Sequence, residues 1–181
     1  MKSKKKESVT TLFTKEQIDD RLCRLVEEIL ADFRGETLTV VCMLKGAVML
    51  FADLVKKLNI PVKMDFIVAS SYGSTQNTSG TVKISKDLGN PITGEHVLLV
   101  EDIIDTGLTL SHVVQHLYLQ KPESLKVCVL LDKPSRRLVD DIEPDYVGFE
   151  IEDKFIVGYG LDYDQRYRNL PYIGIIEITE E

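Results

Sequence analysis

The chain has 181 residues, of which 44% are hydrophobic and 28% charged, and this composition excludes a disordered chain, a collagen-like fibre and a disulfide scaffold. The length predicts a single domain, residues 1–181, that buries a sizeable core. The formal net charge is −7, from 29 acidic and 22 basic residues. We therefore expect no nucleic-acid partner, because phosphate backbones are bound by clustered Lys and Arg.

Cysteine usage and hydropathy indicate the compartment. The three cysteines form no CxxC pair and no signal-peptide pattern is present, which favours a reducing environment. No run approaches the ~18 consecutive apolar residues of a membrane span. We therefore expect a cytoplasmic protein without a membrane partner, in which Cys42 and Cys128, both within apolar runs, belong to the core.

The first element along the chain is a helix. A lysine-rich start predicts a solvated, mobile tail over residues 1–12. Thr14 and Gln17 then form a capping-box pattern, apolar residues recur at helical spacing as far as Phe33, and Gly35 supplies a stop.

Strands and helices then alternate. We expect apolar strands over 38–43, 62–70, 97–100, 125–131, 146–151, 155–159 and 173–178, and helices over 47–58 and from about 109 to 119. Strands that are apolar throughout and alternate with helices are typical of an α/β fold with a mainly parallel central sheet. Ligands of such folds bind beyond the carboxyl ends of the strands.

One connection, residues 71–94, is unusually long and rich in Gly, Ser, Thr and Asn. Connections longer than about 12–15 residues are often lids or binding loops. We expect a lid here, with Val82–Ser85 able to pair as a short hairpin arm.

Residues 97–109 carry an unusual concentration of carboxylates. A buried strand delivers the adjacent Glu101 and Asp102 to its carboxyl end, and Asp105 follows in the loop. Vicinal carboxylates would repel a phosphate, but they suit a ligand that also carries hydroxyl groups or a metal. A solvated turn with an acidic helix cap would explain the same residues, and spacing alone leaves both interpretations open.

The same loop suits a phosphate group. Free N–H groups at a helix start, together with the hydroxyls of Thr106 and Thr109, can cradle an anion. Gly107 lets the backbone approach closely.

This segment resembles the phosphoribosyltransferase signature: a hydrophobic strand, two acidic residues, two apolar residues, Asp-Thr-Gly, and a Thr two positions on. Further segments resemble the hypoxanthine-guanine branch of that family, in its order, and the likeness extends from about residue 13 to 178. These segments are Leu44-Lys45-Gly46, Ser71-Tyr72-Gly73, Lys133 and Asp-Lys-Phe-Ile-Val-Gly-Tyr-Gly-Leu-Asp-Tyr at 153–163. The resemblance implies the type I phosphoribosyltransferase fold, with a small hood formed by the terminal segments. Residues 150–181 would contribute both to this hood and to the purine site.

The resemblance implies transfer of a 5-phosphoribosyl group from phosphoribosyl pyrophosphate to hypoxanthine or guanine in purine salvage. Glu101 and Asp102 would hold the ribose hydroxyls, the loop from Asp105 to Thr109 the 5-phosphate, and Leu44-Lys45-Gly46 the pyrophosphate. In the family this last loop tends to carry a cis peptide. The implied binding residues for this substrate are Lys45, Gly46, Ser71, Tyr72, Glu101, Asp102, Asp105, Thr106, Gly107, Leu108, Thr109 and Arg168.

The purine and the cofactor have their own implied residues. Asp105 would act as general base, and Lys133 would donate to the 6-oxo oxygen and so reject adenine. Phe155 would stack on the base and the backbone of Ile156 would meet its 2-position, with Asp162 close by. The implied cofactor is Mg²⁺, with Glu101, Asp102 and Asp162 as its candidate ligands.

Three points stay open from the sequence. Position 108 is Leu where some members of the branch carry Lys, which weakens inferences about substrate affinity drawn from those members. A preference for xanthine, or a non-enzymatic RNA-binding regulator on the same fold, are the alternative functions, although the charge of −7 and the presence of Asp105 and Lys133 favour catalysis. A homodimer or homotetramer is expected from the resemblance.

Overall fold

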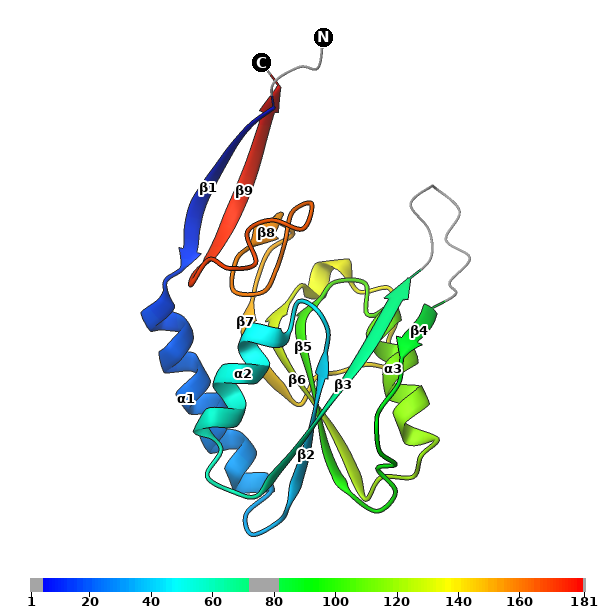
Figure 1. Cartoon of the computed structure of the whole chain (residues 1–181). Coiled ribbons are helices and arrows are strands. Elements are labelled where there is room, and N and C mark those ends of the chain that lie inside the picture. Colours follow the sequence, from blue (N-terminus) through cyan, green and yellow to red (C-terminus); the bar gives the residue numbers. More distant parts are fainter. Residues whose placement is uncertain (1–4, 72–81, 181) are drawn as a thin grey trace.

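The computed structural model describes residues 5–71 and 82–180, and its main body is a six-stranded sheet (Figure 1). The strand order is β4-β3-β2-β5-β6-β7. All neighbours pair in parallel except β4, which lies antiparallel to β3 at one edge. The strands are β2 (Leu38–Met43), β3 (Val62–Ser71), β4 (Val82–Lys86), β5 (His96–Ile104), β6 (Ser124–Asp132) and β7 (Tyr146–Glu150). The predicted α/β class with a mainly parallel sheet is confirmed.

The two chain termini form a second, smaller sheet in the order β1-β9-β8, from β1 (Lys5–Phe13), β8 (Ile156–Val157) and β9 (Ile173–Glu180). The expected hood is therefore present, but the predicted mobile tail is wrong for residues 5–12, which pair with β9 over most of its length. The lysine run suggested a solvated tail, whereas Val9, Thr10 and Thr11 are β-branched residues that favour a strand.

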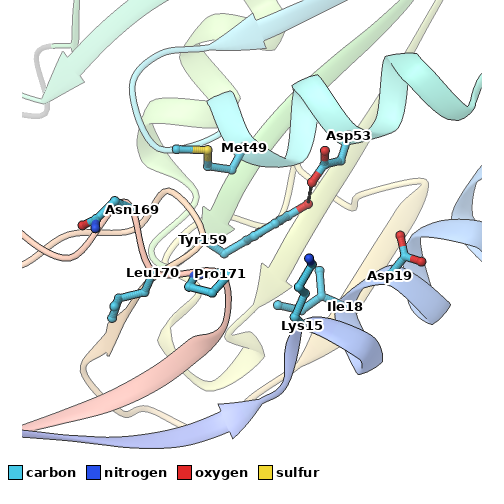
Figure 2. Close-up of a pocket in the computed structure, with 9 residues that line it drawn as sticks. All are labelled: Lys15, Ile18, Asp19, Met49, Asp53, Tyr159, Asn169, Leu170 and Pro171. Atoms are coloured by element: carbon cyan, nitrogen blue, oxygen red, sulfur yellow. Dashed lines mark hydrogen bonds between the residues drawn. The ribbon is translucent and has the colours of Figure 1, made fainter.

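The loop between β8 and β9 is anchored to the body through Tyr159. Its hydroxyl donates a hydrogen bond to Asp53 Oδ2 on α2 at 2.7 Å (Figure 2). Beside this contact lies a mainly apolar cavity of about 240 Å³ between α1, α2 and the loop, lined by Lys15, Ile18, Asp19, Met49, Asp53, Tyr159, Asn169, Leu170 and Pro171. No predicted site residue lines this cavity, so it is a feature separate from the candidate active site.

The long connection divides into two parts. β4 pairs with β3 as expected of a hairpin arm, and Tyr72 with the rest of 72–81 lies outside the described residues. Residues 87–94 run to the opposite, amino end of the sheet, where Gly89 N donates to Asp65 Oδ2 at 2.8 Å and Gly94 N to Lys121 O at 2.9 Å. The predicted lid over 71–94 is therefore too long, because its last eight residues are held away from the carboxyl ends of the strands.

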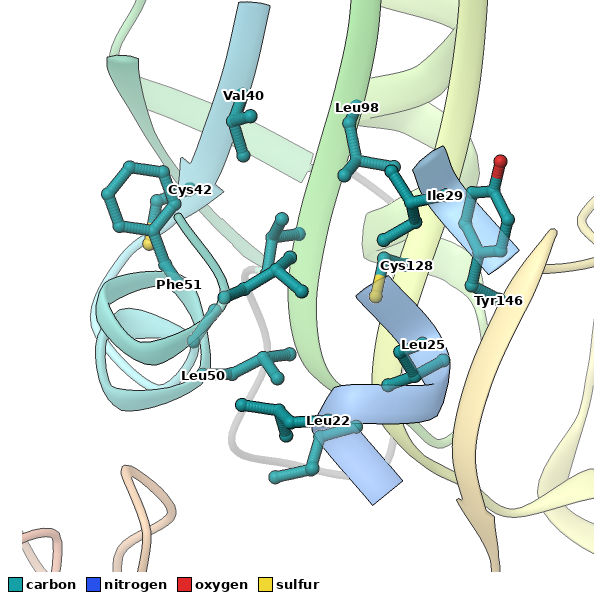
Figure 3. Close-up of a cluster of buried hydrophobic side chains, with 14 of the residues drawn as sticks. Leu22, Leu25, Ile29, Val40, Cys42, Leu50, Phe51, Leu98, Cys128 and Tyr146 are labelled. Atoms are coloured by element: carbon teal, nitrogen blue, oxygen red, sulfur yellow. The ribbon is translucent and has the colours of Figure 1, made fainter. Parts of the chain in front are cut away.

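Helices cover both faces of the main sheet: α1 (Lys15–Asp32) and α2 (Val48–Lys57) on one face and α3 (Leu108–Tyr118) on the other. Alternate residues of β5 divide between the two cores, with Leu98 and Val100 facing α1 and α2, and Val97 and Leu99 facing α3. Figure 3 shows the first core, where the side chains of α1 and α2 meet those of the central strands. Cys42 and Cys128 are buried there, as predicted.

Local signals set the helix boundaries. The capping box at α1 is confirmed, since Gln17 N donates to Thr14 Oγ1 at 3.3 Å and Thr14 N to Gln17 Oε1 at 2.8 Å. Within the described part of the chain, no helix is both long and apolar enough to cross a membrane.

Candidate active site

The vicinal carboxylates lie inside β5, which extends to Ile104 and is thus longer than its apolar run predicted. Glu101 is only 9% exposed, and its burial, assisted by the neighbouring Asp102, raises its pKa well above the usual range. Asp102 N donates to Glu101 Oε1 at 3.0 Å, and Ile103 N donates to Asp102 Oδ1 at 2.9 Å. These bonds hold both carboxylates at the carboxyl end of the sheet.

The segment between β2 and α2 lies directly against Asp102. The Leu44–Lys45 peptide is cis, as the resemblance suggested. A Cβ atom at Gly46 would coincide with the Asp102 carboxylate, and a Cβ at Gly160, whose φ is +103°, would overlap the Gly46 carbonyl oxygen. Gly46 therefore packs against the Asp102 side chain and, through its carbonyl oxygen, against the backbone of Gly160, and only glycine permits both approaches.

The β8–β9 loop brings a cation and a carboxylate to the same place. Arg168 Nη1 donates to Gly160 O at 2.6 Å, and its Nη2 lies 2.6 Å from Asp162 Oδ1. Lys45 Nζ reaches Gln165 Oε1 at 3.4 Å. The structure thus brings Lys45 and Gly46 together with Asp162 and Arg168, although the two pairs are far apart in the sequence.

The segment that we expect to bind the phosphate leads into the start of α3. Gly107 is the helix N-cap with φ +81°, and no side chain caps this end. Thr106 Oγ1 lies 3.5 Å from Leu108 N, so the hydroxyl stands beside the first helical amide. The amides at such a helix start, with the positive end of the helix dipole, are suited to bind a phosphate.

Asp105 and Lys133 belong to one charged network. Arg136 Nε donates to Asp105 Oδ1 at 2.9 Å, and Arg136 Nη1 lies 3.5 Å from Asp153 Oδ2. Lys133 Nζ donates to Lys154 O at 2.7 Å and lies 3.4 Å from Asp153 Oδ1. Lys133 is only 7% exposed, so its ammonium group is held in a defined position at the end of β6.

The predicted base-stacking residue is available for a ligand. Phe155 is 55% exposed, and its ring meets Tyr163 edge-on with centroids 5.6 Å apart. Ile156 follows as a buried residue of β8. Ser71 ends β3. An exposed aromatic ring beside a buried lysine is a suitable arrangement for a flat base with a polar edge.

The carboxylates at this end of the sheet could hold a magnesium ion together with substrate. Within 5–71 and 82–180, no group of three or more His, Cys, Asp or Glu side chains is arranged as a metal site. Mg²⁺, however, usually keeps several waters and takes one or two carboxylates together with substrate phosphates. Glu101 and Asp102 supply such a pair, while Asp162 is engaged by Arg168 and by Gln165 N at 2.8 Å.

Sequence reasoning missed three residues of this site. Gly160 lies in a quoted motif, but its contact with Gly46 depends on the fold. Arg136 and Asp153 connect Asp105 to Lys133, and an exposed arginine after a proline turn carries no signal that separates it from a solvated one.

The chain is similar to known proteins over nearly its whole length. Residues 8–164 match the model of the phosphoribosyl transferase domain. The chain is 46% identical over 179 residues to a hypoxanthine phosphoribosyltransferase of Haemophilus influenzae, covering 97% of this chain and 99% of that protein. It is also 46% identical over 166 residues to a hypoxanthine-guanine phosphoribosyltransferase of Bacillus subtilis, covering 92% of each.

A solved structure agrees with these matches. The crystal structure of a hypoxanthine-guanine phosphoribosyltransferase from Bacillus anthracis, with a HEPES molecule in the active site, superposes with a TM-score of 0.88 at 44% identity. The match covers 95% of this chain and 99% of that one.

Proposed function

Because this chain belongs to the hypoxanthine-guanine phosphoribosyltransferases, we propose that it transfers the 5-phosphoribosyl group of phosphoribosyl pyrophosphate to hypoxanthine or guanine, giving the nucleoside monophosphate and pyrophosphate. The observation that carries the residue roles is the network joining Asp105 to Lys133 through Arg136 and Asp153. Through Lys133 and Arg136, which follow β6, this network connects a candidate proton acceptor, Asp105, with a candidate hydrogen-bond donor to the purine 6-oxo group, Lys133.

The phosphoribosyl substrate is held by groups at the carboxyl end of the sheet. Its 5-phosphate occupies the α3 start at Gly107, and its ribose hydroxyls bond to Glu101 and Asp102. Its pyrophosphate lies against the Gly46 backbone and Arg168. These assignments are supported by the uncapped helix start and by the packing of Gly46 on Asp102.

Magnesium is the cofactor that suits this substrate. Glu101 and Asp102 would hold the ion together with substrate oxygens, and Asp162 is the third candidate ligand. When bound, the ion supplies positive charge that stabilises the departing pyrophosphate. A buried Glu101 beside the half-buried Asp102 fits a site whose charge is balanced by a cation from the substrate complex.

The purine is oriented by Lys133 and Phe155. The Lys133 ammonium turns from Lys154 O to the 6-oxo oxygen, a hydrogen-bond acceptor that adenine lacks, and Phe155 stacks on the base. The purine nitrogen attacks C1 as the bond from C1 to pyrophosphate breaks, and Asp105 accepts the proton that leaves the purine. Most of the acceleration then comes from positioning and fixed charge.

The test is nucleotide formation with Mg²⁺, phosphoribosyl pyrophosphate and, separately, hypoxanthine, guanine, xanthine and adenine. We expect turnover of hypoxanthine or guanine and none of adenine. Asp105→Asn should reduce kcat by roughly 10²–10⁴-fold, the usual contribution of a positioned general base. A preference for xanthine would revise the base specificity. No turnover with any base would refute the proposal and direct attention to RNA binding.

Two further features belong to the proposal. A homodimer or homotetramer is the assembly expected for this family, and light scattering after size-exclusion chromatography measures it directly. The cytoplasmic location is likewise a prediction, tested by fractionation of the source cells.

A further inference from the structure

Arg136 is held opposite Asp105 by the backbone on both sides. Lys133 N donates to Ile104 O at 3.0 Å, and Leu138 N donates to Thr106 O at 3.0 Å. The turn that carries Arg136 therefore runs alongside the loop that carries Asp105. Their contact, 2.9 Å from Nε to Oδ1, does not depend on a long side chain reaching across open solvent.

Stability does not account for this ion pair. The Arg136 and Asp105 side chains are 47% and 43% exposed. Exposed pairs of this kind contribute little to stability, because water screens the charges and two side chains lose freedom. The geometry of the contact is therefore of more interest than its strength.

The contact leaves half of the carboxylate available. An ionised carboxylate has two acceptor oxygens, and the bond from Arg136 uses Oδ1. Among residues 5–71 and 82–180, no hydrogen bond or ion pair engages Oδ2 of Asp105, so this oxygen can accept a proton. A guanidinium at one oxygen also restricts rotation of the carboxylate, so that the other oxygen keeps one direction.

Asp153 completes the arrangement. Its two oxygens lie 3.4 Å from Lys133 Nζ and 3.5 Å from Arg136 Nη1. When Lys133 turns toward a 6-oxo group, Asp153 still holds Arg136 in place. Arg136 thus has one carboxylate partner on each side, Asp105 and Asp153.

We propose that Arg136 is a positioning residue that acts through Asp105, holding Oδ1 so that Oδ2 faces the purine proton. This inference rests on the proposed role of Asp105 as general base. It assigns Arg136 no contact with the substrate, so removing Arg136 should lower kcat while the KM for phosphoribosyl pyrophosphate stays the same.

The experiment is a double-mutant cycle of Arg136→Gln and Asp105→Asn, followed with radiolabelled hypoxanthine. An exposed ion pair orients a side chain only weakly, so we expect Arg136→Gln to lower kcat by about 3–5-fold. In the Asp105→Asn background the same change should alter kcat less than twofold, since residues that act as a unit are not additive. Arg136→Lys, which keeps the charge, should restore part of the activity.

Arg24→Gln is the matched control, because it removes an equal charge from an exposed position on α1. It should leave kcat unchanged, and thermal unfolding should show that each variant is folded. Equal losses from Arg136→Gln in both backgrounds, or no loss in the wild type, would overturn the inference while the base role of Asp105 stands. Wild-type turnover by Asp105→Asn would instead refute that role, and the inference with it.

Discussion

The contact between Gly46 and Asp102 gives the sharpest prediction for the site. In Gly46→Ala the new methyl group would occupy the space of the Asp102 carboxylate, so either that carboxylate or the loop must move. The loop is confined on its other side, where Gly160 packs against the Gly46 carbonyl oxygen. We therefore expect the carboxylate of Asp102 to be displaced.

The magnitude follows from what Asp102 loses. Its bond from Ile103 N, 2.9 Å long, involves a charged acceptor. Such bonds contribute about 1.5–3 kcal/mol, while Gly→Ala regains about 0.4–1 kcal/mol through the unfolded chain. The free energy of unfolding should fall by about 0.5–2.6 kcal/mol, which for a chain of this size lowers Tm by roughly 1–10 °C.

The loss of catalytic activity in Gly46→Ala should be larger than the loss of stability alone would cause. Asp102 is a proposed ribose and metal ligand, and Gly46 lines the proposed pyrophosphate site. A misplacement of about 1 Å at such a site can reduce turnover by roughly 10²-fold. The assay is kcat/KM for phosphoribosyl pyrophosphate, at a temperature where circular dichroism shows the variant to be folded.

Gly89→Ala is the matched control. Its added Cβ would lie 3.6 Å from Asp65 Oδ2, an ordinary contact, at the amino end of the sheet. It should leave kcat/KM unchanged. A Gly46→Ala variant that keeps kcat/KM within twofold of the wild type would refute the argument that this contact positions the reacting groups.

Three further predictions concern single side chains. Glu101→Gln should raise the free energy of unfolding of the ligand-free protein at pH 7. The raised pKa of Glu101 stabilises the fold only while the group is protonated, and this stability is lost as pH rises from about 4.5 through the folded-state pKa. In urea unfolding between pH 4 and 8, the free energy of unfolding should therefore decline less for the variant than for the wild type. Tyr159→Phe removes the bond to Asp53 and should lower the free energy of unfolding by about 1 kcal/mol in the same assay; an unchanged value would show that this contact does not anchor the β8–β9 loop. Phe155→Leu should raise the KM for hypoxanthine by up to roughly 5–150-fold, since stacking of a base on an aromatic ring contributes about 1–3 kcal/mol. An equal rise in the KM for phosphoribosyl pyrophosphate would contradict the role of Phe155 at the purine.

The elements set by local pattern were predictable from the sequence. The apolar run of β2 spans residues 38–43 both as predicted and as observed, and the capping box placed the start of α1 within one residue. These features depend on neighbours along the chain: side-chain periodicity and the bonds between Thr14 and Gln17. The signature around β5 likewise placed the carboxylates on this strand and the proposed phosphate-binding loop directly before α3, within one continuous segment.

Features that depend on distant partners were not predictable in this way. β1 is a strand because β9, at the other end of the chain, lies beside it, and its lysines concealed the β-branched residues that follow. Residues 87–94 resemble a lid in composition, yet Asp65 holds them at the amino end of the sheet. The partnership of Arg136 with Asp105 depends on two parallel loops whose alignment no local pattern encodes.

The site concentrates features that disfavour folding, which argues that they are retained for chemistry. Glu101 is a buried carboxyl beside another acid, and four of the five non-glycine residues with positive φ in the described chain lie between 159 and 167. Each such conformation costs about 1–2 kcal/mol. The cost is offset by anchors outside the site, such as Tyr159 on Asp53 and Arg166 on Glu7, 2.6 Å apart. The loop that carries Asp162 and Arg168 is thus held from both sides in a conformation that it would not adopt alone, as expected where strain is stored at a functional site.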